Sequence, residues 1–552
     1  MAYVGALDQG TSSTRFVIFD QKGQITASAQ EEHEQIYPRP GWVEQRAEEI
    51  WSNSVRVMQT AMARANLEAK DLASIGITNQ RETTVVWDKE TGEPVHNAVV
   101  WNCGRTSGIV REMQAKLGGV DALREITGYV FLKKIILNDV FRVIRSRYLT
   151  KVPCFSPFVF FCASFRRCYY FLDSLPISTY FAGTKLRWLL NEVPGLEERA
   201  KNGEVLFGTI DCWLIWKFTN GDVHATDVTN ASRTLLVDVG TLQWDDRLLE
   251  IFDIPKSILP TIQPSLGGQF GAISSPSCSA FQGIPIGAIL GDQHAATFGQ
   301  ACFTVGDAKC TFGTGAFMFM NVGLADPTTK RPVVSKQGLM TTPFYQAAGE
   351  PPVYALEGAV AYAGSLIQWL RDNIQFGESA VEIAKLAASV PDAQGVRFVP
   401  AFNGLFAPHW RDDARGIIVG LTAFHTRAHI ARAAIDSTCF QTTEVFDAME
   451  KDSGVALSEL RVDGGMTANP QLLQFTADLL ETKVLLPKIL ETTALGVAFA
   501  AGLAQGVWKS QEEIKELWTV DKTVEPDMSE EERAELKQSW SKAIGRSVGW
   551  ED

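Results

Sequence analysis

The chain has 552 residues, of which 45% are hydrophobic and 21% are charged. At roughly 100–200 residues per domain, this length predicts several units, most simply two large lobes. Lys and Arg number 51 against 64 Asp and Glu, a net charge of −13, which excludes a general nucleic-acid or anionic-membrane binder because both need a positive surface. The nine cysteines form no CxxC pair and fit a reduced, cytoplasmic compartment.

The chain begins with a predicted β-hairpin. An apolar strand leads into a turn of small and hydroxyl residues over Asp8–Thr14, and a second apolar strand follows. This start has neither a basic segment nor a long apolar run, so we expect no secretory signal. About 300 residues later the same order of strand, Gly/Thr turn and strand recurs over Ala308–Met320. Two hairpins of one kind predict two similarly built lobes that face a common cleft.

Residues 129–174 depart from the composition of the rest. They contain eight Phe, four Tyr and three Cys but no Gly, Glu or Gln, and eight basic residues against two Asp give a local charge of +6. The other 506 residues therefore sum to −19. The most apolar part, Val152–Phe165, is shorter than the ~20 residues of a bilayer span and is followed by Arg166 and Arg167. We therefore expect no stable membrane insertion.

Helical and strand patterns alternate along the remaining chain. Short apolar strands such as Ser74–Ile77 stand between segments that have the apolar spacing of amphipathic helices. This alternation is typical of an α/β fold. The helices we expect span residues 48–65, 184–191, 364–372, 429–449, 471–481 and 493–503.

Phosphate binding requires backbone N–H groups in tight turns of small residues. The sequence has no Gly-Lys dipeptide, which excludes a Walker A loop, and no GxGxxG pattern. Each hairpin tip taken alone is better explained as an ordinary turn, and it is their pairing that favours phosphate binding. Asp8 stands beside the first tip, where a carboxylate is compatible with phosphates if a divalent cation lies between them. The alternative for Asp8 is an Asx-turn.

Three further groups of polar or small residues follow predicted strands. Arg81 and Glu82 can hydrogen-bond vicinal hydroxyls, the first donating and the second accepting, although such a dipeptide is also typical of a solvated turn. Asp292 can accept a proton from a substrate hydroxyl in a cleft, or it caps a helix that begins near Ala295. The strand and Gly pair of Leu460–Gly465 suit a backbone that passes beneath a nucleotide base, or a plain strand–helix turn.

Six motifs in chain order resemble the FGGY carbohydrate kinase family, within the actin/hexokinase/Hsp70 ATPase-fold superfamily. They are Asp8–Arg15, Gly76–Thr83, Tyr180–Lys185, Gly291–Gln293, Gly313–Gly315 and Asp463–Gly465. Each motif is weak alone, but six in order are specific, and the resemblance extends over residues 1–128 and 175–552. Residues Tyr37–Gln45 and Trp101 are most similar to the members that phosphorylate glycerol.

The resemblance implies a fold class and a reaction. The fold would be α/β, with two ribonuclease-H-like lobes of the actin-like ATPase type around a central nucleotide and substrate cleft. The lobes would span residues 1–300 and 301–552. Mg-ATP would phosphorylate glycerol to sn-glycerol 3-phosphate, the first step of glycerol catabolism, and the chain would form a homo-oligomer, a dimer or a tetramer.

The resemblance also implies residue roles. Asp292 would be the general base and Asp8 would organise Mg²⁺. The residues expected to bind the polyol are Arg81, Glu82, Trp101, Tyr180, Asp292, Gln293 and Phe317. The residues expected to bind the nucleotide are Thr11, Ser12, Ser13, Arg15, Thr314, Gly364, Gln368, Gly465 and Asn469. The stretch Ser277–Gly283 has no Arg where some bacterial members carry a Gly-rich, Arg-containing loop for fructose 1,6-bisphosphate, so we expect that regulation to be absent.

Within this resemblance, residues 129–174 are an insertion in the first lobe, six residues before Tyr180. Their composition suits translated non-coding sequence, and our leading hypothesis is a retained intron or an error in the gene structure. The alternative is a genuine surface insertion, which loop-closure entropy alone would tolerate. Two other functions remain open: another FGGY sugar kinase, or a nucleotide-binding product whose catalysis the insertion impairs.

Overall fold

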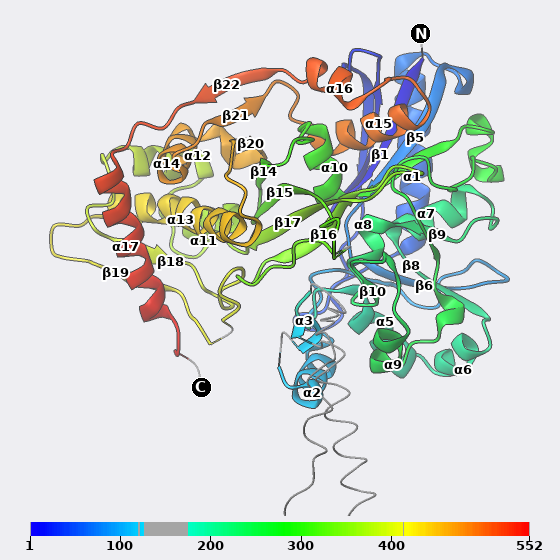
Figure 1. The fold of residues 1–552 in the computed structure, drawn as a ribbon, viewed down its shortest axis with the longest axis horizontal. Coiled ribbons are helices and arrows are strands. Elements are labelled where there is room, and N and C mark those ends of the chain that lie inside the picture. Colours follow the sequence, from blue (N-terminus) through cyan, green and yellow to red (C-terminus); the bar gives the residue numbers. More distant parts are fainter. Residues whose placement is uncertain (1, 120–121, 126–174, 330, 412, 551–552) are drawn as a thin grey trace, which may run out of the picture.

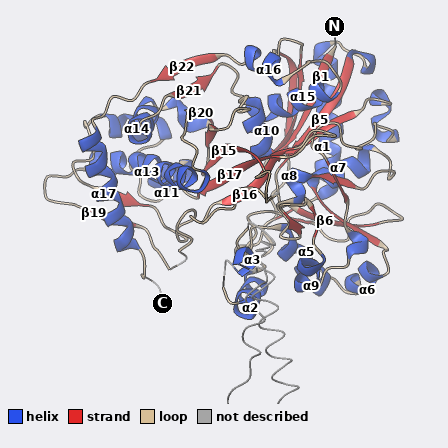
Figure 2. Ribbon diagram, viewed as in Figure 1, coloured by secondary structure: helices blue, strands red, loops and turns tan. Residues whose placement is uncertain are grey.

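The structure is a computed structural model that describes residues 2–119, 122–125, 175–329, 331–411 and 413–550. Figure 1 shows two bodies side by side, one built mainly from the N-terminal half of the chain and the other mainly from the C-terminal half. Figure 2 shows that each body contains a sheet with helices around it. The proposed insertion 129–174 lies outside the described residues, so the structure does not test its origin.

The first lobe is built on a five-stranded sheet in the order β13-β5-β1-β2-β3. Strands β1 and β2 form the predicted hairpin, β3 pairs antiparallel with β2, and β5 and β13 run parallel to β1. Apolar side chains cover both faces of β1, as expected of a central strand. The strand bounds are Tyr3–Gln9 (β1), Ser13–Phe19 (β2), Ile25–Glu32 (β3), Leu72–Asn79 (β5) and Ile286–Gly291 (β13).

The second lobe repeats this plan in a seven-stranded sheet, in the order β16-β17-β15-β14-β20-β21-β22. The second predicted hairpin is β14–β15, and β20 lies parallel to β14 as β5 lies parallel to β1. The structure therefore confirms the two-lobed α/β fold. The bounds are Asp307–Phe312 (β14), Ala316–Leu324 (β15), Met340–Tyr345 (β16), Val353–Val360 (β17), Glu459–Asp463 (β20), Val484–Pro487 (β21) and Val520–Val524 (β22).

Two helices cross where the lobes meet. Helix α10 (Asp292–Gly299) contacts β15 of the second sheet, and α15 (Thr492–Ala504) lies against β1, β5 and β13 of the first sheet (Figure 1). Glycine at their crossing is a steric requirement. A Cβ on Gly299 would lie 2.0 Å from the carbonyl oxygen of Thr492, and a Cβ on Gly496 would lie 1.8 Å from that of Ala295. The helix backbones thus touch directly and fix one lobe against the other.

A small four-stranded sheet, β4-β7-β6-β8, extends the first lobe below its main sheet (Figure 1). It carries the segments from which Glu82 and Trp101 emerge. Its strands are Glu44–Gln45 (β4), Thr84–Asp88 (β6), Ala98–Val99 (β7) and Val205–Thr209 (β8). The remaining short strands are Ala225–Asp227 (β9), Val237–Asp238 (β10), Gln243–Trp244 (β11), Thr261–Gln263 (β12), Arg397–Val399 (β18) and Ile417–Val419 (β19).

The expected helices are present, with ends that differ by no more than four residues from the predicted ones: Ala47–Ala65 (α1), Ala182–Glu192 (α5), Gly364–Asp372 (α11), Arg427–Ser453 (α13), Pro470–Leu480 (α14) and α15. The other helices are Ser107–Leu117 (α2), Ala122–Glu125 (α3), Leu196–Lys201 (α6), Ile210–Phe218 (α7), Val228–Ala231 (α8), Asp246–Phe252 (α9), Ala380–Ala388 (α12), Gln511–Leu517 (α16) and Glu530–Ser547 (α17). Across the described ranges, none of the helices has the length and apolar character needed to cross a membrane.

The chain on both sides of the undescribed segment returns to the same core. Leu123 before it and Leu175 and Ile177 after it are 0–1% exposed and belong to one apolar cluster. The carbonyl of Ile177 also accepts a hydrogen bond from the side-chain amide of Gln114 at 2.9 Å. The residues that lead into Tyr180 are therefore anchored to the first lobe by this cluster and by Gln114.

Candidate active site

One edge of the first sheet gathers the polar residues that the sequence analysis singled out. Strands β1, β5 and β13 are parallel, and their carboxyl ends therefore lie at the same edge. Asp8 lies near the end of β1, Arg81 and Glu82 follow β5, and Asp292 follows β13. The topology thus brings the predicted base, the predicted polyol ligands and the predicted metal ligand to one place.

Asp292 is the first residue of α10, which begins three residues earlier than expected. Its Oδ1 accepts the backbone N–H of Gln293 at 2.7 Å and lies 3.0 Å from Nε of Arg81. Its side chain is 33% exposed. The alternative of a capping Asp ahead of a helix at Ala295 is wrong, because Gly291 is the N-cap residue and Asp292 is already inside the helix. A half-exposed carboxylate held by one oxygen is suited to accept a proton through the other.

Arg81 and Glu82 are buried, at 3% and 1% exposure, so the alternative of a solvated turn is wrong. Both terminal nitrogens of Arg81 donate to the carboxylate of Glu357, at 3.0 and 2.8 Å. Oε1 of Glu82 accepts from Nε of Arg233 at 2.6 Å. Buried charges of this kind are stable only when each has a partner, and here every one does.

Arg233 and Glu357 were not predicted from the sequence. Arg233 follows α8 in a segment without any recognisable motif, whereas Glu357 is a single carboxylate inside the otherwise apolar strand β17, a signal that could have been used. Burial opposes ionisation of Glu357, but the guanidinium groups of Arg233 and Arg81 outweigh it and lower its pKa. For Glu82, burial dominates and raises the pKa. Of these two buried glutamates, Glu357 therefore favours the ionised form more strongly.

Two of the three predicted aromatic residues pack against each other. The rings of Trp101 and Tyr180 meet edge to face, 5.4 Å apart, and the guanidinium of Arg233 lies 5.6 Å from the centre of the Tyr180 ring. Phe317 stands in β15 of the other lobe and is half-buried. Burial raises the pKa of Tyr180, so its hydroxyl remains protonated and can both donate and accept. These residues can cover the carbon chain of a small polyol.

A buried lysine holds the segment that carries Tyr180. Nζ of Lys185 donates to the carbonyls of Thr179 and Phe181, at 2.8 and 3.3 Å, and to that of Tyr180 itself. Burial lowers the pKa of Lys185 to about 7. An ammonium has three donors, which match the three carbonyls that face it.

Gln293, another predicted polyol ligand, is held from the second lobe. Its Oε1 accepts a hydrogen bond from Nζ of Lys309, which also donates to Oγ1 of Thr311 at 2.9 Å. Lys309 is fully buried, and burial lowers its pKa. It was missed by sequence reasoning, although a lysine within an apolar hairpin strand was a usable signal. The contact joins β14 to the first turn of α10.

The tip of the first hairpin is rigidly held. The carbonyl of Thr11 accepts hydrogen bonds from Nε2 of His33 and Nε2 of Gln35, both at 2.9 Å, and from Nε2 of Gln45 at 2.6 Å. Burial lowers the pKa of His33, so its neutral ring donates from Nε2. The indole N–H of Trp101 donates to Oγ1 of Thr11 at 3.0 Å. The predicted phosphate tip and the predicted polyol wall are thus directly connected.

The remaining residues of the first tip are accessible. The N–H of Gly10 donates to the carbonyl of Ser13 at 2.9 Å, which closes the turn and leaves Ser12 exposed at its apex. Oγ of Ser13 accepts from the side-chain amide of Gln30 at 2.9 Å. Arg15 stands next to Asp8 across the β1–β2 pair and forms an ion pair with Glu491 at the start of α15. Glu491 was not predicted.

Asp8 lies in β1 rather than in an Asx-turn. Burial raises its pKa to about 7, Arg15 opposes this, and the nearby carboxylates of Asp292 and Glu491 raise it further. The described residues contain no group of three or more His, Cys, Asp and Glu side chains that could hold a metal ion by themselves. Mg²⁺ in kinases is held by one or two carboxylates together with substrate phosphates. Excess negative charge beside a phosphate-binding turn fits that type of site.

The second hairpin tip meets the start of α11. The N–H of Gly313 donates to the carbonyl of Gly315 at 2.9 Å, and Thr314 is exposed at the apex. The N–H of Gly364 donates to the carbonyl of Gly313 at 2.9 Å, and both the N–H and the hydroxyl of Ser365 donate to that of Thr314. A Cβ on Gly364 would lie 2.6 Å from the Gly313 oxygen, which explains the glycine.

The other predicted nucleotide residues lie on two segments that contact this tip, α11 and the turn after β20. Gly464 has a φ of +93°, and a Cβ there would lie 2.4 Å from the carbonyl of Phe312, whereas Gly465 has open space above it. Asn469 caps α14 by accepting the N–H of Gln471 at 3.0 Å, which leaves its side-chain N–H groups for a ligand. Gln368 is exposed on α11. The turn is thus a strand–helix connection in which Gly465 is not covered by neighbouring atoms.

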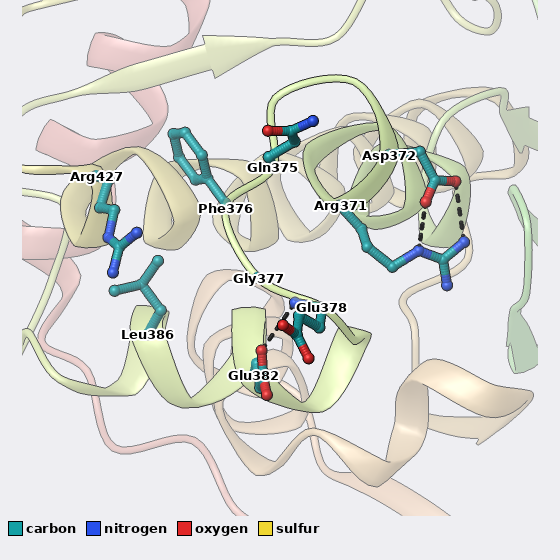
Figure 3. A pocket seen from close by; sticks show the side chains of 9 residues that line it. All are labelled: Arg371, Asp372, Gln375, Phe376, Gly377, Glu378, Glu382, Leu386 and Arg427. Atoms are coloured by element: carbon teal, nitrogen blue, oxygen red, sulfur yellow. Dashed lines mark hydrogen bonds and ion pairs between the residues drawn. The ribbon is translucent and has the colours of Figure 1, made fainter.

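A separate cavity of about 690 Å³ lies between α11, α12 and the start of α13. Figure 3 shows that it contains none of the predicted site residues, although it adjoins the end of α11. Arg371 on its rim is paired with Asp372 at 2.6 Å.

The loop Ser277–Gly283, singled out because it has no Arg, overlaps a 3₁₀ turn over Pro276–Phe281 in which Cys278 and Phe281 are buried.

The chain is similar to curated glycerol kinases over nearly its whole length. It is 49% identical over 550 residues to that of Methylorubrum extorquens, covering 99% of this chain and 98% of the relative. It is 50% identical over 551 residues to that of Brucella anthropi, covering 99% of each. Among solved structures, Plasmodium falciparum glycerol kinase with ADP superposes with a TM-score of 0.84 at 35% identity, covering 99% of this chain and 98% of that one.

More distant matches bear on the fold alone. The gluconate kinase of Lactobacillus acidophilus superposes with a TM-score of 0.77 at 20% identity.

The domain models of the FGGY family of carbohydrate kinases match residues 3–135 and 168–299 for the N-terminal domain and 308–505 for the C-terminal domain. Residues 136–167, inside the proposed insertion, are left unmatched between the two N-terminal segments. With matches over most of its length, the chain belongs to the FGGY family of carbohydrate kinases.

Proposed function

We propose that this protein transfers the γ-phosphoryl group of ATP to a terminal hydroxyl of glycerol, with sn-glycerol 3-phosphate and ADP as products. The observation that carries the proposal is the position of Asp292. It is partly exposed at the edge of the first sheet, fixed through Oδ1 by Arg81 and Gln293, and set among the residues expected to bind a polyol. Near-full-length identity of about 50% to glycerol kinases supports this substrate over a sugar.

Asp292 acts as the general base in this proposal. Its free oxygen takes the proton of the attacking hydroxyl while Arg81, Glu82, Tyr180 and Gln293 hold the polyol. A small uncharged polyol offers only hydroxyl groups, so selectivity depends on polar side chains that would be left unpaired by a substrate lacking one. Trp101 and Phe317 cover the carbon chain.

The two hairpin tips bind the nucleotide. Thr11, Ser12, Ser13 and Arg15 meet the phosphates from the first lobe and Thr314 from the second. Gly364, Gln368, Gly465 and Asn469 bind the adenosine. Asp8 holds Mg²⁺, whose chemistry here is to neutralise charge on the phosphates during transfer. The raised pKa of Asp8, caused by burial and neighbouring carboxylates, supports a cation at this point.

The lobes of this enzyme divide near residue 300 in our proposal, which agrees with family matches that end at 299 and resume at 308. We also propose a cytoplasmic homo-oligomer, a dimer or a tetramer, insensitive to fructose 1,6-bisphosphate through Ser277–Gly283. Sedimentation and inhibition assays will test these points. Inhibition by that sugar that depends on this loop would contradict the last of them.

A coupled ADP-release assay on the full chain tests the function. Glycerol, xylulose, gluconate and ribulose are compared at matched concentrations with Mg-ATP. The proposal predicts a kcat/KM for glycerol at least about 100-fold above the sugars, since a hydrogen-bonding site rejects poor matches strongly. No preference for glycerol would overturn the choice of substrate, and a preferred sugar would indicate another FGGY sugar kinase. No turnover of any acceptor would favour a nucleotide-binding protein without catalysis.

A further inference from the structure

Five charged side chains form a continuous, largely buried chain of ion pairs between the two lobes, in the order Asp292, Arg81, Glu357, Arg233 and Glu82. The successive contacts measure 3.0, 2.8, 2.7 and 2.6 Å. The side chains of all but Asp292 are 0–2% exposed, whereas that of Asp292 is 33% exposed. Three of the five, Asp292, Arg81 and Glu82, are already part of the proposed polyol site. The roles of Arg233 and Glu357 remain to be explained.

Glu357 reaches this chain from the other lobe. It lies in β17, directly opposite Phe319 of β15, and β15 is the strand that leaves the Thr314 tip. Arg81 and Arg233 both belong to the first lobe. One carboxylate of the second lobe thus binds two guanidinium groups of the first lobe. This carboxylate belongs to the sheet that carries the second phosphate turn.

The geometry around Arg81 shows what Glu357 does. A guanidinium has five N–H donors; one each from Nη1 and Nη2 is directed at Glu357, while Nε lies 3.0 Å from Oδ1 of Asp292 in an ion pair. The second N–H group of each terminal nitrogen therefore remains for a ligand. Because the contact with Glu357 is bidentate, it fixes the plane of the guanidinium and hence the direction of those two donors.

Glu357 also separates two like charges. Its Oε2 accepts from Nη1 of Arg81 at 3.0 Å and from Nη1 of Arg233 at 2.7 Å. Without that charge the two guanidinium groups would repel each other in a buried space. Arg81 would then have Asp292 as its remaining carboxylate partner among these contacts, and a stronger pull on Asp292 would compete with proton transfer.

We propose that Glu357, assisted by Arg233, is a positioning residue that orients Arg81 toward the polyol and couples polyol binding to the lobe carrying the Thr314 turn. This inference rests on the proposed glycerol kinase function. Glu357 does not touch the reacting atoms; it acts through Arg81 on substrate binding and through the Arg81–Asp292 contact on the base.

The test compares Glu357→Gln and Glu357→Asp with the parent enzyme. Glu357→Gln keeps the shape but removes the charge, so we expect KM for glycerol to rise roughly 10–100-fold, as for loss of a charged hydrogen bond, with KM for ATP within about twofold. Glu357→Asp keeps the charge and is expected to recover part of the loss. A matched control is Asp436→Asn, which removes the charge from the buried Arg432–Asp436 pair (2.8 Å) in α13, outside the site. It is expected to leave KM for glycerol unchanged.

Substrates that lack one hydroxyl give a second readout, which a merely structural role would not move. The parent is expected to reject propane-1,2-diol or propane-1,3-diol strongly, because one of them lacks the hydroxyl that Arg81 holds. In Glu357→Gln the ratio of kcat/KM for glycerol to kcat/KM for the rejected diol should fall about tenfold, because a misplaced Arg81 no longer forms its hydrogen bond with that hydroxyl. If Glu357→Gln does not fold, judged by circular dichroism, Glu357→Asp and Arg233→Lys provide both readouts instead.

The outcomes separate the two claims. A parent without glycerol kinase activity would overturn the proposed function and this inference with it. This inference alone would be overturned if the parent is active but the Glu357 and Arg233 variants change KM for glycerol and for ATP equally. It would also be overturned if these variants leave the discrimination between glycerol and each diol unchanged. A selective rise in KM for glycerol with reduced diol discrimination supports it.

Discussion

Oδ1 of Asp292 lies 3.0 Å from Nε of Arg81, and the same oxygen accepts the backbone N–H of Gln293 at 2.7 Å. Both contacts are made to one oxygen of the carboxylate, which leaves Oδ2 to accept a proton. Arg81, proposed to bind the polyol, and Asp292, proposed to deprotonate it, are therefore in direct contact. Substrate binding at Arg81 and proton transfer at Asp292 should respond together to changes at either residue.

Asp8 is expected to destabilise the ligand-free protein at neutral pH. Its folded-state pKa of about 7, raised first by burial, lies above the unfolded value near 4. Between these values the folded state binds a proton that the unfolded state has lost, so stability falls as the pH rises from about 4 to 7. Asp8→Asn removes this cost. Because the Asp8 side chain keeps some solvent exposure in the folded protein, we discount the full effect and expect a gain of about 1–3 kcal/mol at pH 8.

Urea unfolding of parent and Asp8→Asn protein without Mg²⁺ or nucleotide measures this effect. The gain should shrink as the pH is lowered from 8 to 5, and the variant should lose kinase activity. A gain that does not depend on pH, or a variant less stable than the parent at pH 8, would contradict the assigned origin of the pKa shift.

The ion pair between Arg15 and Glu491 is expected to compete with ATP. Both side chains are partly exposed, at 27% and 43%, so the pair contributes less than about 1 kcal/mol. Phosphates that bind Arg15 must displace Glu491. We predict that Glu491→Gln lowers KM for ATP about two- to fivefold and leaves KM for glycerol unchanged. The control is Glu481→Gln, which removes a partner of Arg533 on the far side of the second lobe. An unchanged or higher KM for ATP in Glu491→Gln would contradict the prediction.

The crossing of α10 and α15 should not tolerate a methyl group. A Cβ on Gly496 would lie 1.8 Å from the Ala295 carbonyl oxygen and 2.6 Å from the Gly299 nitrogen, so the backbones of the two helices would have to move apart. Gly496→Ala is expected to lower the free energy of unfolding by about 3 kcal/mol or more. In contrast, Gly545→Ala in α17, where nothing lies within 4 Å, should stabilise the protein by about 0.5–1 kcal/mol. Equal effects in chemical denaturation would mean that the helices are not in direct contact.

Residues 129–174 give a prediction about the mature protein. If they derive from a retained intron, the native chain is lighter by about 5 kDa, at roughly 0.11 kDa per residue. Intact mass spectrometry of protein from its native source measures this difference. The family match that omits residues 136–167 agrees with an insertion here. Native peptides covering Arg142–Lys151 would show instead that the segment is translated and retained.

Local signals in the sequence singled out many of the residues that the structure brings together at the proposed site. The two hairpin tips were found because Gly and hydroxyl residues between apolar strands specify a turn within a few positions, and the structure has both. Arg81, Glu82 and Asp292 were found because polar residues directly follow apolar strands. Parallel pairing of β1, β5 and β13 then brings them together, as expected for carboxyl ends of neighbouring strands.

Contacts between distant residues could not be predicted in this way. Arg233 and Glu357 are 124 positions apart and Arg15 and Glu491 are 476 apart, and no short pattern specifies such partners. The start of α10 was placed three residues too late because Asp292 has a carboxylate that fits a cap, whereas Gly291 is the N-cap residue. Pairing of charges across the lobes depends on the packing of two complete sheets.

The central claim is that Asp292 is the base for phosphorylation of glycerol, and steady-state kinetics of Asp292→Asn tests it most directly. The substitution preserves size, so KM for ATP should stay within about twofold. Loss of the base should lower kcat for glycerol by about 100–10,000-fold. Circular dichroism and the Asp436→Asn control exclude a general loss of structure. An Asp292→Asn enzyme that phosphorylates glycerol as fast as the parent would contradict the account.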